Sequence, residues 1–120
     1  MRRVPVYVLE FAPPMEGIDG IFNTIRVGKA WMKRIAPGDT VLLMDKKQSV
    51  IFGKARVQSI LSGKLNAIEE DHARYNHNQK NNADIAIAPA RLRINLRKRY
   101  GPQIIHDNKI VTVIYMKRLE

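Results

Sequence analysis

The sequence of 120 residues contains no cysteine. A chain without thiols has no disulfide framework, no thiolate zinc site, no iron–sulfur cluster and no cysteine nucleophile. This composition is compatible with a reducing compartment, and we expect a cytoplasmic protein. Long apolar runs are missing as well, because no segment approaches the roughly 18 uninterrupted apolar residues of a membrane-spanning helix. Pro5 and Glu10 interrupt the apolar N-terminal stretch before a secretory signal could form, so we expect neither export by that route nor a membrane partner.

Acidic residues are scarce. The chain has 11 Asp and Glu against 21 Lys and Arg, which gives a formal net charge of +10. Such an excess of cations suits a polyanionic partner, and nucleic acid is the first candidate, with an acidic protein as the alternative. The remaining composition, 45% hydrophobic and 27% charged, is that of one globular domain covering residues 1–120. The oligomeric state is left open.

Several apolar runs of strand length are present. Residues 4–11 predict a first or edge strand. Residues 40–44 and 50–60 flank a polar turn and predict a hairpin. Residues 103–106 and 110–117 predict a closing hairpin, and the last of these strands is apolar on both faces, which favours a central position in a sheet.

The strand predicted at residues 50–60 has two different faces. Gly53 is expected to mark a bulge in it. The alternation places one set of residues toward the core, namely Ile51, Gly53, Ala55 and Val57. The opposite face is basic and carries Phe52, Lys54, Arg56 and Gln58.

Helix signals occur in three places. Residues 29–35 are long enough for about two turns. Asn66 and Glu69 have the spacing of a capping box, which predicts a helix over residues 67–75. The pattern of residues 92–97 is ambiguous, because its alternation suits a strand while Leu92, Leu96 and Tyr100 have helical spacing. Pro89, which suits a first helical turn, and Gly101, which suits a helix end, decide for a helix.

Residues 76–82, with the sequence Asn-His-Asn-Gln-Lys-Asn-Asn, are too polar to bury and are expected to form an exposed loop. In sum the chain predicts five or six strands and two or three helices that are segregated rather than alternating. The fold class is therefore α+β, with a small curled sheet or barrel.

Three motifs in a fixed order resemble the ASCH superfamily of small domains with a PUA-like β-barrel. They are Gly20–Arg26 followed by Pro37–Leu43 and Gly53–Val57, then Ile68–Ala73, then Arg99–Pro102 leading into Val111–Tyr115. The resemblance extends from the first strand to the last residues. It implies a PUA-like barrel of five or six strands with two or three flanking helices, and a module that binds RNA or a modified nucleoside.

The family also includes a small amidohydrolase of 4-acetylcytidine, in which a Lys, a Thr and a Glu are assigned the catalytic work. Thr24 and Glu70 occupy two of these positions, and Ile21 occupies that of the lysine. A threonine nucleophile needs a base to take its proton, so Ile21 counts against this activity. Lys29, in the following loop, is the candidate replacement. Whether the protein is an enzyme, as a nucleoside amidohydrolase or a ribonuclease, is left open.

The resemblance thus makes Thr24, Arg26, Lys29 and Glu70 the candidate ligand-binding residues, with Thr24 and Glu70 catalytic if the protein is an enzyme. Each has a simpler interpretation. Thr24 suits any strand as a β-branched residue. Arg26 could hold a phosphate or a base, or equally pair with Glu70. Glu70 alone is typical of a solvated helix residue.

Clustered cations are the candidate nucleic-acid contacts, because a phosphate backbone would relieve their mutual repulsion. The residues are Lys54, Arg56, Arg91, Arg93, Arg97, Lys98 and Arg99. The alternative is an ordinary charged surface. Trp31, Tyr75 and Tyr100 are candidate stacking surfaces for unpaired bases, although a single Trp in a small domain commonly belongs to the core.

The three histidines do not have metal-site spacing. His72 and His77 point to different faces of a helix, and His106 is distant in sequence. We therefore predict no metal and no cofactor.

Overall fold

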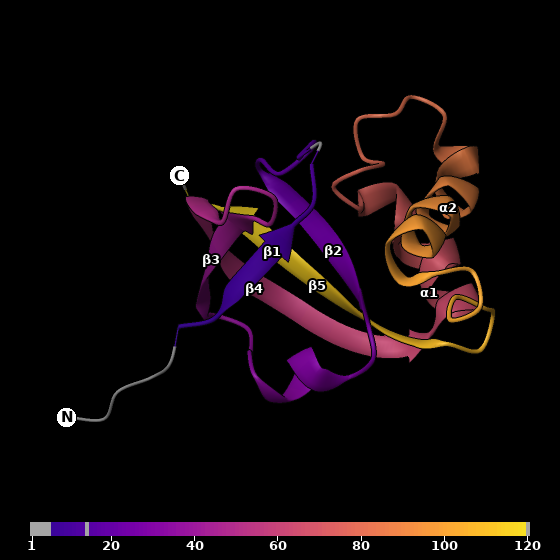
Figure 1. Ribbon diagram of the computed structural model, residues 1–120, viewed down its shortest axis with the longest axis horizontal. Coiled ribbons are helices and arrows are strands. Elements are labelled where there is room, and N and C mark those ends of the chain that lie inside the picture. Colours follow the sequence, from indigo (N-terminus) through magenta and orange to yellow (C-terminus); the bar gives the residue numbers. More distant parts are fainter. Residues whose placement is uncertain (1–5, 14, 120) are drawn as a thin grey trace.

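The computed structural model describes residues 6–13 and 15–119. Two α-helices and five strands lie in this part of the chain, together with three short 3-10 turns (Figure 1). The strands are β1 (Val8–Phe11), β2 (Ile21–Val27), β3 (Thr40–Asp45), β4 (Val50–Lys64) and β5 (Ile110–Arg118). The helices are α1 (Leu65–His72) and α2 (Ala88–Tyr100), and the 3-10 turns are η1 (Ala30–Lys33), η2 (Ala73–Tyr75) and η3 (Ile85–Ile87).

The strands form one sheet in the order β1-β3-β4-β5-β2. β1 pairs with β3 in parallel, and the other neighbours are antiparallel. The sheet curls into a half-barrel, and both α-helices lie together beside the β2 and β5 side of it (Figure 1). The α+β class with a small PUA-like barrel is confirmed. β1 is an edge strand as predicted, although residues 4 and 5 of that prediction lie outside the described part.

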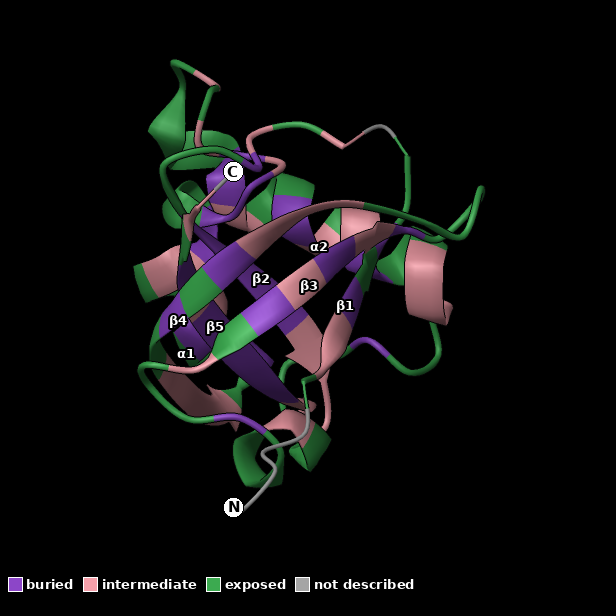
Figure 2. Cartoon of the chain, turned by 90° about the vertical axis from the view of Figure 1, so that its left-hand side faces the viewer, coloured by how far each residue is buried: buried purple, intermediate pink, exposed green. Residues whose placement is uncertain are grey.

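Two hydrophobic cores lie on opposite faces of the sheet. The inner core fills the curl of the half-barrel and includes Phe11, Phe22, Leu43, Val57 and Met116. The helix-side core lies between the sheet and the helices and includes Ile25, Leu65, Leu92, Leu96 and Val113. β5 is buried along most of its length and lies between β4 and β2, which confirms its predicted central position (Figure 2).

The two cores lie on opposite faces of edge strand β2, and its residues alternate between these faces. Phe22 belongs to the inner core and Ile25 to the helix-side core. By the two-residue period of a strand, Thr24 and Arg26 therefore share the face of Phe22.

The hairpin of β3 and β4 forms as predicted, with a bulge beside Gly53. Leu43 pairs with Gly53 and Met44 pairs with Ile51, so Phe52 is the extra residue. The predicted faces are correct beyond the bulge, where Ala55 and Val57 are buried. They are wrong before it: Ile51 is 45% exposed, while Phe52 packs against the inner core. The extra residue shifts the alternation by one, which exchanges the faces of the residues that precede it.

Helix α1 forms, but the predicted capping box does not. The residue before the helix is Lys64, the last residue of β4, and it makes no side-chain cap. The first amides are satisfied by the loop before β5 instead: Leu65 N donates to Lys109 O at 2.8 Å and Asn66 N to Asp107 O at 3.1 Å. The side chain of Asn66 does supply one of the expected bonds, since its Oδ1 accepts from Ala67 N at 2.9 Å, but Glu69 binds Arg93 instead of a first-turn amide.

Helix α2 has its predicted bounds and end signals. Pro89 lies in the first turn and Gly101 ends the helix with a φ of 97°. The hairpin predicted between residues 103–106 and 110–117 is wrong. Residues 103 and 104 lie in a turn and residues 105 and 106 have no regular structure. Ile105 is buried in the helix-side core, and β5 takes its two partners from β2 and β4.

The helix expected over residues 29–35 is only the 3-10 turn η1. Gly28, with a φ of 88°, and the turn at Pro37 and Gly38 leave little room for a longer helix. Within the described residues, none of the helices has the length and apolar character needed to cross a bilayer.

Candidate functional site

A groove of about 530 Å³ lies between strand β2, the β1–β2 connection and one face of helix α2. The sheet contributes Thr24 and Ile25. The segment after η2 contributes Asn76, His77, Asn78 and Gln79, and α2 contributes Arg91, Leu92, Ile94, Asn95, Leu96, Lys98 and Arg99. The connection before β2 adds Ala12, Pro13 and Glu16. The wall is therefore a mixture of neutral amides, an imidazole, three cations and one carboxylate over an apolar floor.

One wall of the groove is the polar segment that was predicted to be an exposed loop. That prediction is wrong: His77 is 5% exposed and Gln79 is 3% exposed. His77 N donates to Asn23 O at 3.0 Å, and Asn76 Oδ1 accepts from Asn78 N at 3.1 Å. These partners satisfy the backbone amides of His77 and Asn78, which helps the segment to lie buried against β2, while Oε1 of the buried Gln79 has no partner among the described residues.

His77 anchors this wall to the inner core. Its ring packs edge-on against Phe11, with centroids 5.1 Å apart, and against Phe22 at 6.3 Å. Burial lowers the pKa of His77 to about 4, and the nearby positive charges of Arg26 and Arg99 act in the same direction. The ring is therefore neutral near pH 7, and Nδ1 lies 3.3 Å from the carbonyl oxygen of Glu16, where Nδ1–H donates.

The connection from β1 to β2 passes very close to His77. Gly17 has a φ of 66°, and a Cβ at this position would lie 2.0 Å from the carbonyl oxygen of His77. Only glycine allows both this backbone conformation and this approach.

The structure brings together Thr24 and Arg26, two of the residues predicted to bind a ligand. Thr24 is 1% exposed, and its Oγ1 accepts a hydrogen bond from Arg26 Nε at 3.2 Å. The guanidinium of Arg26 lies over the ring of Phe11, 4.9 Å from its centroid, and so bridges the two edge strands. Its Nη2 is buried without a hydrogen-bond partner among the described residues. Burial lowers the pKa of Arg26 to about 10, which still leaves it protonated near neutral pH.

A second, smaller recess of about 330 Å³ adjoins Arg26. It is lined by Glu10 of β1, Arg26 of β2, Lys46 after β3, and Arg99 and Tyr100 at the end of α2. Arg99 lines both this recess and the groove. The pairing of Arg26 with Glu70, one of the two alternatives considered for this arginine, does not form; the carboxylate that acts on the charge of Arg26 is Glu10.

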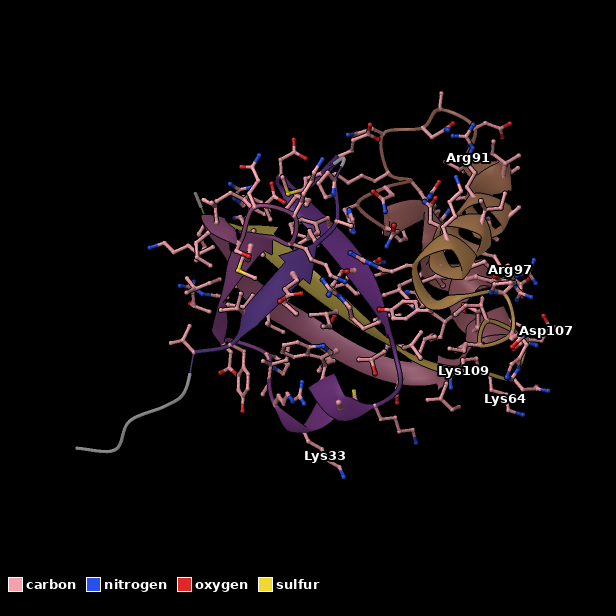
Figure 3. All side chains as sticks on the ribbon, in the orientation of Figure 1. Lys33, Lys64, Arg91, Arg97, Asp107 and Lys109 are labelled. Atoms are coloured by element: carbon pink, nitrogen blue, oxygen red, sulfur yellow. The ribbon has the colours of Figure 1, made fainter. Side chains whose placement is uncertain are left out.

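The cations of α2 are divided between two sides of the helix. Arg91, Lys98 and Arg99 face the groove. Arg93 is held by carboxylates instead: its Nη2 lies 2.6 Å and its Nε 3.0 Å from the two oxygens of Glu69, and its Nη1 lies 2.5 Å from Asp107. These contacts raise the pKa of Arg93 and lower that of Asp107. Arg97 lies on the outer side of the helix, away from Arg91 (Figure 3).

The remaining candidates lie outside both recesses. Glu70 is exposed on α1 and Lys29 is exposed just before η1. Lys54 and Arg56 lie on β4, Arg56 exposed and Lys54 partly buried. Ile21 begins β2 and is 57% exposed.

The three aromatic candidates have different environments. Trp31 packs against the inner core and meets Tyr7 edge-on, so it belongs to the core. Tyr75 is exposed beside Arg74, and Tyr100 lines the smaller recess. The described residues contain no group of three metal-ligating side chains.

Sequence reasoning missed several residues of the two recesses: Glu10, Lys46, Asn76, Gln79 and Asn95. The helical period did carry a signal for part of the site, because residues 91, 95, 98 and 99 lie on one face of a helix. The burial of the polar segment had no local signal, since its partners lie on β2.

No protein-family model and no curated protein matches the sequence. Solved structures do match the fold. Protein EF3133 from Enterococcus faecalis V583, described by the family model DUF984, has a TM-score of 0.55 at 11% identity, over 86% of this chain and 62% of that one. A point mutant of ZmASCH from Zymomonas mobilis has a TM-score of 0.55 at 11% identity, over 92% of this chain and 67% of that one. The chain thus spans about two thirds of the length of these proteins, and it has an ASCH-like fold.

Proposed function

We propose that this domain binds RNA, or a modified nucleoside within RNA, in the groove between β2 and α2. The observation that carries the proposal is the position of Arg91, Lys98 and Arg99, which rim a polar groove on a chain with a net charge of +10. The cysteine-free composition agrees with a cytoplasmic location.

The groove has the size and chemistry for a base. Ligand pockets typically measure about 300–1,000 Å³ and combine apolar walls with a few polar groups, and this groove, at about 530 Å³, lies in that range. The partly buried side-chain amides of Asn78 and Asn95 offer both donors and acceptors to a base edge, whereas the amide of buried Asn76 is already bonded to Asn23 and Asn78. Oε1 of Gln79 is buried without a partner among the described residues. A donor on a bound ligand would satisfy it.

The cations around the groove would supply affinity by contacting phosphates. Arg91 and Lys98 are exposed, and Arg99 is partly buried. Arg93 contributes less, because Glu69 and Asp107 already occupy its donors. Exposed Arg97 and Arg56, and Lys54, would add contacts only to an RNA that extends beyond the groove.

The test is binding of a fluorescent single-stranded RNA, measured by anisotropy from low to physiological salt. Each phosphate contact on a single strand adds about 0.7 to the slope of log K against log salt. The triple variant Arg91→Gln, Lys98→Gln, Arg99→Gln should therefore lose about 2 from this slope. Lys33→Gln, an exposed cation of η1 on another side of the molecule, is the matched control (Figure 3). Absence of binding by the parent protein at low salt would refute the proposal.

The alternative function is hydrolysis, as a nucleoside amidohydrolase or a ribonuclease that uses Thr24 and Glu70. Thr24 belongs to the lining of the groove, although its side chain is almost wholly buried. Its Oγ1, however, accepts from a protonated arginine that cannot remove its proton. Turnover of acetylated cytidine or structured RNA that disappears in Thr24→Ala or Glu70→Gln would establish the enzyme. Hydrolysis gained only by Ile21→Lys would identify a site that lacks its base.

An acidic protein is the remaining candidate partner for the basic surface. RNA and such a protein would compete for the same cations. A pull-down that RNA does not displace would favour the protein partner.

A further inference from the structure

The smaller recess has the chemistry of an anion site. It lies where the two edge strands of the half-barrel face each other, and its side chains come from β1, β2, the turn after β3 and the end of α2. Arg26, Lys46 and Arg99 are its cations, Glu10 is its carboxylate, and Tyr100 adds a phenol. Four separate parts of the fold thus place charged or polar groups around one small space.

Arg26, which lines the recess, carries an unsatisfied donor. Arg26 uses Nε for Thr24 and stacks on Phe11, and its Nη2 is buried without a partner among the described residues. A buried charged donor without an acceptor is unfavourable, and a bound anion relieves that cost. Burial also lowers the pKa of Arg26, because the protein does not replace all the hydrogen bonds that water would make to the guanidinium.

The charge of the recess selects among anions. Three cations and one carboxylate leave a charge of +2. The end of helix α2 subtracts only about half a charge. A phosphate monoester carries about −1.5 to −2 near pH 7, whereas an internal phosphodiester carries a single negative charge. The balance therefore fits a terminal phosphate better than a phosphate within a chain.

Arg99 connects this recess to the groove, since it lines both. We propose that the smaller recess binds the terminal phosphate monoester of a nucleotide or RNA end whose base lies in the adjoining groove. The base position rests on the proposed function, while the phosphate site stands on its own residues. The domain would then distinguish a phosphorylated RNA end from a hydroxyl end.

The experiment compares one short RNA in three forms, with a 5′-phosphate, a 3′-phosphate or hydroxyls at both ends. We expect one phosphorylated form to bind at least about 10-fold more tightly than the hydroxyl form, in keeping with a charge-assisted, partly buried contact. Lys46→Gln should reduce this preference, and Glu10→Gln should increase it about 2- to 5-fold by removing an exposed repelling charge. Both substituted residues are exposed, so folding is expected to persist, and Lys33→Gln is the control.

Arg26→Gln is the most direct variant and is read together with its thermal unfolding, because Arg26 also contacts the inner core. Inorganic phosphate serves as a second probe: it should raise the melting temperature of the parent protein more than that of Lys46→Gln. If all three RNAs bind equally, or if Lys46→Gln and Glu10→Gln both leave the preference unchanged, the phosphate site is refuted while the proposed function stands. If no RNA binds but phosphate stabilises the parent more than Lys46→Gln, the proposed function is refuted while the phosphate site stands.

Discussion

Protonation of His77 should release the wall of the groove from the inner core. The ring is buried between Phe11 and Phe22, and its pKa is about 4 in the folded protein against an ordinary value of 6.5. Between these two values the unfolded chain binds more protons than the folded one, so stability is complete above pH 6.5 and is lost as the pH falls toward 4. Between pH 6.5 and pH 5, about 1.5 pH units, the free energy of unfolding falls by about 1.36 kcal/mol per unit, which is about 2 kcal/mol in all.

The assay is urea unfolding at pH 8 and pH 5. His77→Gln keeps a donor for the carbonyl of Glu16 but cannot titrate. Acidification from pH 8 to pH 5 should therefore lower the free energy of unfolding of the parent protein by about 2 kcal/mol more than that of His77→Gln. The control is His106→Gln, at an exposed position of the loop before β5, which should follow the parent. The reasoning is refuted if His77→Gln and the parent lose equal stability on acidification.

Two further pairs of variants test the packing around the site. Gly17→Ala places a Cβ 2.0 Å from a backbone oxygen and should destabilise the fold by more than about 2 kcal/mol. Gly38→Ala, with a φ of 95° but open space around the new Cβ, should cost only about 1 kcal/mol. Thermal or urea unfolding measures both. Equal costs would show that the close approach is unimportant. Arg93→Gln should lower stability by about 1–3 kcal/mol in urea unfolding, because it leaves partly buried Glu69 without its partner. Asp107→Asn, at the exposed end of the same arginine, should cost much less. The reverse order in urea unfolding would contradict this assignment of the two ion pairs.

Much of the fold could be predicted where local signals and tertiary packing agree. The β3–β4 hairpin has apolar runs on both sides of a polar turn, and α2 has Pro89 and Gly101 at its two ends. Both formed as predicted. The central position of β5 followed from its apolar residues on both faces.

The failures have a common physical cause, which is that the deciding partner is distant in sequence. The capping box at α1 was replaced by carbonyls of Asp107 and Lys109, about 40 residues away. The polar segment after η2 is buried because Asn23 supplies its backbone partner. The face exchange at Ile51 and Phe52 depends on the register with β3, which composition alone does not determine.

The candidate site was predictable in part. Thr24 and Arg26 lie two residues apart on one face of β2, so the strand period placed them together. The structure divides the seven predicted nucleic-acid contacts, with Arg91, Lys98 and Arg99 at the groove and Arg93 held by Glu69 and Asp107. This division follows from the angular positions on α2 and from carboxylates that only the folded chain brings near.

The central claim is that the groove between β2 and α2 binds RNA, and amide chemical shifts measured during titration with a short RNA test it most directly. Binding there should shift the backbone signals of residues 24–26, 76–79 and 91–99 together. Shifts confined to β4 around Lys54 and Arg56, or no shifts at low salt, would contradict the account.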